Sequence, residues 1–176
     1  MIPTLALDTI VQKLLTVIST DAAILTYCVE TWDTPLKVYV GVPRKHPPTQ
    51  TDCPYVVIRP GAKTEGAGQS ENTYAVAVGW SILSDVDPTV TVLLDDDGTP
   101  EVPATIIGTT IEAPGFADCD ALGQLLLAAI DGASSDNPIW LVDYEVECVE
   151  FLPQVVGDMQ IEFVLSSSHA GALAFE

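Results

Sequence analysis

The chain has no lysine or arginine after Lys63. Its six basic residues lie among the first 63 positions, where five carboxylates leave a net charge of +1, and the remaining residues carry −20, giving −19 overall. An acidic surface repels phosphates and anionic lipid headgroups. Ordinary nucleic-acid binding and membrane binding are therefore not expected, although DNA could pass such a surface without adhering. Solubility in a salty or acidic setting is the alternative explanation for the charge.

The four cysteines form no C-x-x-C pair, and no run of about twenty apolar residues is present. Widely spaced cysteines are not typical of a metal site. The first ten residues lack the basic region of a signal peptide, and Asp8 interrupts their apolar run. We expect a soluble protein made in the reducing cytoplasm, with no bound metal, and with Cys119 and Cys148 at positions that could face the core.

Familiar catalytic motifs are also lacking, including the P-loop, the nucleophile elbow and H-E-x-x-H. The pair Asp85/Asp87 and the acidic turn Asp95–Asp97 are candidates for a divalent-cation site. An EF-hand beginning at Asp95 fails because Ile106 stands where the pattern requires glutamate. Neither histidine lies in a context typical of a catalytic pair with a serine or cysteine. We predict no enzyme and no cofactor, and keep an acidic-site, metal-dependent enzyme as the least favoured alternative.

The most regular stretch is Thr73–Leu83, in which large apolar residues alternate with small ones. This period of two predicts a strand at the centre of a sheet, with one face buried in the core. The other face carries small residues, including Ala75, Ala77 and Gly79. Small residues permit close approach, so a helix, a neighbouring subunit or an insert could lie there.

Periodicity and caps predict the remaining elements. The expected helices cover 4–19, 22–27 and about 118–130, and the other expected strands cover 36–40, 55–59, 141–151 and 158–165. Pro60-Gly61 is expected to end the second strand, 153–157 to form a turn, and Cys148-Val149 to mark a bulge. This order predicts an α+β fold: a mixed, mainly antiparallel sheet with helices packed on one face.

We expect one domain over residues 1–176. Residues 84–114 are predicted to form an inserted β-hairpin or loop, because two β-rich runs flank the acidic turn and prolines limit further pairing. The segment 166–176 is expected to be a flexible tail. Val42–Cys53, VPRKHPPTQTDC, is expected to be irregular because of its three prolines, and it holds the densest positive cluster.

Three features together resemble the tail terminator, or tail completion, family of long-tailed bacteriophages, including the lambda-like terminators. They are an N-terminal amphipathic helix followed by STDAAILTY, the segment KVYVGVPRKHPPTQTDCPYVVIRPG, and an alternating strand followed by a helix and two long alternating strands. The resemblance covers most of the chain except Ser84–Pro114. These motifs are degenerate and include no invariant chemical signature.

The resemblance implies a structural virion protein that forms a homo-oligomeric ring, commonly a hexamer, at the head-proximal end of the tail. Such a ring caps the tail tube, ends its polymerisation and joins it to the head or neck. Its partners would be the major tail tube protein and a neck or head-completion protein, with assembly in the host cytoplasm and DNA passing through the lumen without specific binding. A neck protein, head–tail connector or adaptor of the same particle is the alternative.

For a ring, subunit contacts are heterologous, so one surface meets a different surface of the neighbour. A mildly basic first third and an acidic remainder suit that arrangement. We expect interface roles for the residues that carry this charge pattern or the small-residue face: Arg44, Lys45, His46, Arg59, Ala75, Ala77, Glu145 and Glu147. Plain solvation of the charged residues is the alternative.

Overall fold

The computed structural model describes residues 6–65, 71–84, 89–94, 106–112, 114–134, 139–151 and 153–166. In chain order the elements are α1 (Leu7–Thr20), α2 (Ala22–Trp32), β1 (Lys37–Val40), η1 (Gln50–Asp52), β2 (Tyr55–Thr64), β3 (Glu71–Leu83), β4 (Thr89–Leu94), β5 (Ile106–Glu112), α3 (Pro114–Ser134), β6 (Ile139–Phe151) and β7 (Gln154–Ser166).

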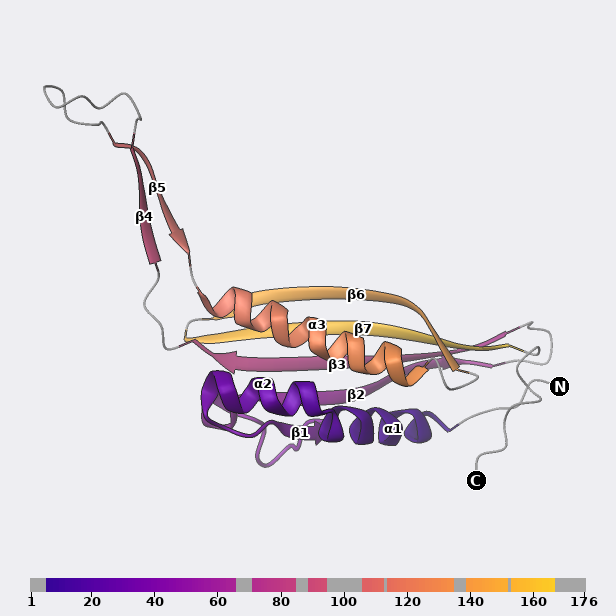
Figure 1. The fold of residues 1–176 in the computed structure, drawn as a ribbon. Coiled ribbons are helices and arrows are strands. Elements are labelled where there is room, and N and C mark those ends of the chain that lie inside the picture. The colour runs from indigo at the N-terminus through magenta and orange to yellow at the C-terminus, as the bar shows by residue number, and fades with distance from the viewer. Residues whose placement is uncertain are drawn as a thin grey trace, which may run out of the picture.

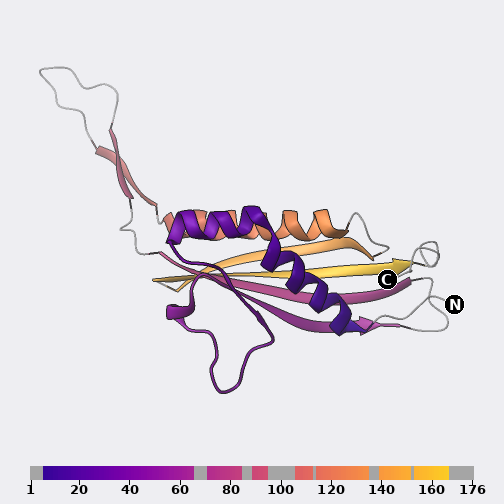
Figure 2. The ribbon, with the colours of Figure 1, turned by 60° about the horizontal axis from the view of Figure 1, so that its bottom comes forward.

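Five strands form one sheet in the order β1-β2-β3-β7-β6. The pair β1–β2 is parallel and the other three pairs are antiparallel. The long helices pack on one face of this sheet, as the two ribbon views show (Figures 1 and 2). The predicted α+β fold, with a mixed and mainly antiparallel sheet covered by helices on one side, is confirmed, and β3 is its middle strand.

The N-terminal helix pair forms for reasons visible in the sequence. Helix α1 buries the apolar positions spaced three and four apart, among them Ile10, Leu14 and Ile18, against the sheet. Asp21 then begins α2 by accepting hydrogen bonds from the amides of Ala23 and Ile24 at 2.9 and 3.0 Å. A capped N-terminus allows the second helix to begin with only Asp21 between it and the end of the first.

The core face of β3 is buried almost completely. Its alternate large residues are at most 1% exposed: Tyr74, Val76, Val78, Trp80 and Ile82. The Trp80 indole lies beneath α3, where its Nε1 donates a hydrogen bond of 2.9 Å to the carbonyl of Cys119. Cys119 is itself buried, as predicted, whereas the side chain of Cys148 lies outside the described residues.

The strands β4 and β5 pair with each other in a separate two-stranded antiparallel sheet. They stand away from the five-stranded body (Figure 1). The end of β3 and the start of α3 lie next to each other. A Cβ added to Gly115 would overlap the side chain of Ser84. The residues joining β4 to β5 lie outside the described part, so the complete inserted hairpin of 84–114 stays a prediction.

Several expected boundaries were wrong. Strand β2 continues through Pro60-Gly61 to Thr64 with a register shift between Pro60 and Lys63. Beyond Ile58, β2 has no pairing with β1, so a proline that lacks an N–H is tolerated on that edge. Helix α3 begins earlier than expected, with Pro114 in its first turn, a position where the missing N–H removes no helical hydrogen bond.

The connection between the last two strands is also tighter than predicted. Strand β7 begins at Gln154, so most of the expected 153–157 turn is strand, and Cys148 and Val149 pair in regular register with Gly157 and Val156. The register shift in β6 lies instead between Leu141 and Asp143. Alternation alone did not locate it because Val142 continues the apolar period across that point.

No single helix among the described residues is both long and apolar enough to cross a membrane. Helices α1 and α2 pass that test only when taken together, and they are bent by 54° at their junction.

Candidate functional site: a basic pocket beside strand β1

The positive cluster of the sequence lies in the loop that joins β1 to β2. Because these adjacent strands are parallel, the chain must return along the length of the strand before β2 can begin, which takes a connection of a dozen or more residues. Residues 41–54 make this return and extend from the sheet on the side away from α3 (Figure 2). The parallel pairing therefore places an irregular, proline-rich loop over the edge of the sheet.

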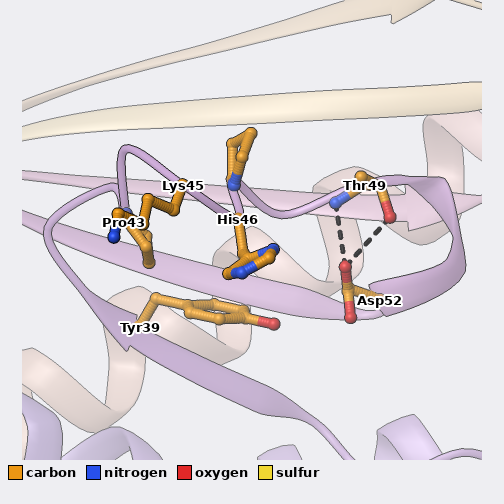
Figure 3. Close-up of a pocket in the computed structure, with 7 residues that line it drawn as sticks. Tyr39, Pro43, Lys45, His46, Thr49 and Asp52 are labelled. Carbon is orange, nitrogen blue, oxygen red and sulfur yellow. Dashed lines mark hydrogen bonds between the residues drawn. The ribbon is translucent and has the colours of Figure 1, made fainter.

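The loop and β1 enclose an open pocket of about 590 Å³. Figure 3 shows the His46 imidazole above the ring of Tyr39, with Lys45 beside Pro43 on one side and Thr49 with Asp52 on the other. The lining is Tyr39, Pro43, Lys45, His46, Pro47, Thr49 and Asp52. It combines an aromatic and proline surface with two basic side chains.

Asp52 holds the far end of the loop in place. Its carboxylate accepts hydrogen bonds from the Thr49 amide at 2.9 Å and the Thr49 hydroxyl at 3.0 Å, in a capping box around η1. It also pairs with Lys37 Nζ of β1 at 2.9 Å. The Lys37 hydrogen bond, followed by the two from Thr49, lowers the pKa of Asp52 to about 2. The Asp52 charge is thus engaged by groups within the loop and β1.

The floor of the pocket is tied to the middle of the sheet. The rings of Tyr39 and Tyr55 meet edge to face with centroids 6.1 Å apart. The Gln154 amide donates to the Tyr55 hydroxyl at 3.2 Å and to the Ser81 hydroxyl at 2.7 Å, and Ser81, fully buried, donates to the Val155 carbonyl at 3.2 Å. Buried polar groups need such partners. This chain of contacts fixes Tyr39 on the helix-free face.

Lys45 and His46 make no ion pair or hydrogen bond with any other residue that the structure describes, and both are exposed. Neighbouring Arg44 is likewise exposed but does not line the pocket. The arrangement can hold an anionic group against Lys45 and His46 and an aliphatic or ring surface against Tyr39 and the prolines. Among the described residues, no three His, Cys, Asp or Glu side chains come together as metal ligands.

The other predicted interface residues lie elsewhere on the sheet. Arg59 crosses the helix-free face from β2 and forms an ion pair with Asp158 of β7. The intervening strand carries Gly79, where an added Cβ would lie 3.4 Å from Asp158 Oδ2 and 3.9 Å from Arg59 Nη2. The glycine of the small-residue face therefore makes room for a contact within the subunit.

Ala77 is buried and Ala75 is half-buried on the same face of β3. Glu145 and Glu147 lie on β6 opposite Gln160 and Asp158 of β7, while their side chains lie outside the described part of the chain. The candidate cation residues Asp85, Asp87 and Asp95–Asp97, and the tail beyond Ser166, also lie outside it. The structure thus brings Lys45 and His46 together beside Tyr39 of β1. Arg59 on β2 and the alanines Ala75 and Ala77 on β3 lie outside this pocket.

Sequence reasoning missed Tyr39, Thr49 and Asp52 as parts of this site. The Thr49–Asp52 pair does carry a readable signal, since a threonine followed three residues later by an acid is typical of a capped helical turn. Tyr39 has no such signal, because its role depends on the parallel return of the chain.

Comparison with models of protein families and with curated proteins finds no match for this chain.

Proposed function

We propose that this protein is a structural subunit that assembles into a ring at the end of a bacteriophage tail, as a tail terminator. The proposal begins from the resemblance in the sequence to that family. An α+β body with no metal-ligand cluster among its described residues, and with charged surface at the edge of a sheet, is compatible with an assembly role.

The observation that carries the proposal is the β4–β5 ribbon. Among the strands that the structure describes, β4 and β5 pair only with each other, in a sheet separate from that of the body. A two-stranded antiparallel pair is at best marginally stable alone in water, and it usually needs a third strand or a packed face. The ribbon stands away from the body (Figure 1), so a second molecule is the natural source of that missing surface.

The test is the native mass of the full chain, measured by light scattering and native mass spectrometry at several concentrations in ordinary salt. A discrete closed oligomer is expected, since heterologous contacts that close give rings of fixed number. A monomer at all concentrations would overturn the ring.

A second measurement asks what the oligomer does. Added to purified tail tube protein during polymerisation, a terminator shortens the tubes in proportion to its concentration and remains at one end. A neck or connector protein would instead bind head-completion protein and leave tube length unchanged. That second result would reject the terminator and keep an assembly role in the same particle.

A further inference from the structure

The basic residues at 44–46 differ from others in this strongly acidic chain. Arg44, Lys45 and His46 are exposed, consecutive, and without an ion pair to any described residue. Three of the remaining cations each pair with a carboxylate: Lys37 with Asp52, Arg59 with Asp158 and Lys63 with Glu65. With 25 carboxylates in the chain, the lack of a partner at this cluster points to an anionic group supplied from outside the subunit.

The pocket favours a carboxylate carried on a polypeptide over a bare anion. Two prolines and the Tyr39 ring provide surface for the aliphatic part of an acidic side chain, Lys45 provides the charge, and His46 provides a ring N–H donor. Asp52 also lines the pocket, but its charge is engaged by Lys37 and Thr49. The pocket therefore keeps a net attraction for an incoming acid.

A row of acids lies at the opposite edge of the same sheet. Asp143, Glu145 and Glu147 alternate along β6, at register positions opposite Glu162, Gln160 and Asp158 of β7. Directly opposite residues of an antiparallel pair lie on the same face. These positions therefore share a face with Glu162, whose side chain is exposed. The strand register places Tyr39 on the same face, which carries no helix.

The sheet order separates the two surfaces by its full width. With β1 at one edge and β6 at the other, four strand spacings set them about 19 Å apart. Complementary surfaces on opposite edges of one subunit cannot meet within that subunit. In two copies placed head to tail such surfaces face each other, and heterologous contacts of this kind give a ring when the rotation between subunits closes.

We propose that the basic pocket of one subunit, built on Tyr39, Lys45 and His46, binds the acidic row of β6, Asp143, Glu145 and Glu147, of a second copy. This inference rests on the proposed ring and names its contact. Arg44, beside the pocket, adds long-range attraction for the same row.

Charge reversal tests the pairing. One variant carries Arg44→Glu and Lys45→Glu, and the other carries Glu145→Lys and Glu147→Lys. In each variant alone every pocket meets a row of its own sign, so the subunit dissociation constant should rise by at least about tenfold. In an equimolar mixture each variant supplies the surface that the other needs, and alternating oligomers of the wild-type mass should form.

The matched control for the β6 variant is Asp8→Lys with Glu30→Lys, which makes the same charge change at exposed helix positions. It should assemble like the wild type, and circular dichroism should show that all variants are folded. If the wild type is oligomeric and both reversal variants assemble unchanged, the contact is overturned while the ring stands. Loss of assembly in both without recovery on mixing also overturns the pairing. A monomeric wild type overturns the ring itself.

Discussion

The indole of Trp80 covers the backbone of Gly157, its register partner across β3 and β7, so closely that a Cβ on this glycine would overlap the ring. Gly123 of α3 meets the same indole from above, where an added Cβ would lie 2.5 Å from Cζ2. The largest side chain of the core is thus held between two glycines, one on the helix and one on the sheet. This arrangement sets how closely α3 approaches the sheet.

We expect Gly157→Ala to destabilise the fold by about 1–3 kcal/mol, because the added methyl group must displace a fully packed indole. Denaturant unfolding followed by tryptophan fluorescence measures this. The matched control is Gly132→Ala, where an added Cβ meets nothing within 4 Å. In an α-helix that change should be neutral or stabilising by up to about 1 kcal/mol. Equal stability of the two variants would contradict the packing described for Trp80.

The ion pair that anchors the pocket loop should be sensitive to acid. Asp52 has a pKa of about 2 in the folded protein, below the ordinary value near 4. A lowered folded-state pKa stabilises the folded state at pH values above the ordinary pKa, and the contribution is lost as the pH falls from about 4 through about 2. Asp52→Asn should lower the thermal midpoint at pH 6, and the gap from the wild type should narrow toward pH 2. A gap independent of pH would show that the charge of Asp52 does not hold the loop.

The buried thiols should be slow to react. Burial raises the pKa of Cys28 to about 11, so at pH 8 about one thiol in a thousand is ionised. We expect iodoacetamide to modify Cys28 only when the protein unfolds, at a rate that follows denaturant concentration. Mass spectrometry of labelled peptides measures this, and Cys53, which is half-buried, provides the comparison within the same chain. Rapid labelling of Cys28 in native buffer would show that α2 opens locally.

The body should fold without the segment between β3 and α3. Because Ser84 and Gly115 adjoin, a short glycine–serine linker can replace residues 85–113. We expect the shortened chain to keep the cooperative unfolding of the body and to lose oligomer formation. A shortened chain that still assembles would remove the ribbon from the interface, and one that fails to fold would show that the segment belongs to the body.

The fold could be predicted where the burial of a residue follows from the pattern of apolar residues within its own strand or helix. The alternation of Tyr74, Val76 and Val78 identified the middle strand and its buried face because only one register places them all inside. The parallel pairing of β1 with β2 could not be predicted, since a four-residue strand has the same pattern in either direction. The continuation of β2 past Pro60 could not be predicted either, because it depends on where the pairing with β1 ends.

The site could be predicted only in part, for the same reason. Arg44, Lys45 and His46 were identified by charge, which the sequence shows directly. The assembly of Lys45 and His46 with Tyr39 into a pocket depends on where the loop returns across the sheet. Arg59, chosen on equal grounds, pairs instead with Asp158, two strands away in the sheet and distant in sequence.

The return loop that carries the pocket contributes no residue to the hydrophobic core between Gly41 and Cys53. Its length is required by the parallel pair, and Thr49 and Asp52 hold its far end, whereas its exposed side chains from Val42 to Pro47 are free to vary. Mutations there can change which surface the protein binds without a large loss of stability. The basic residues of the pocket thus lie in a stretch that the core does not use, so the charge of this surface can evolve, or be redesigned, while the body stays the same.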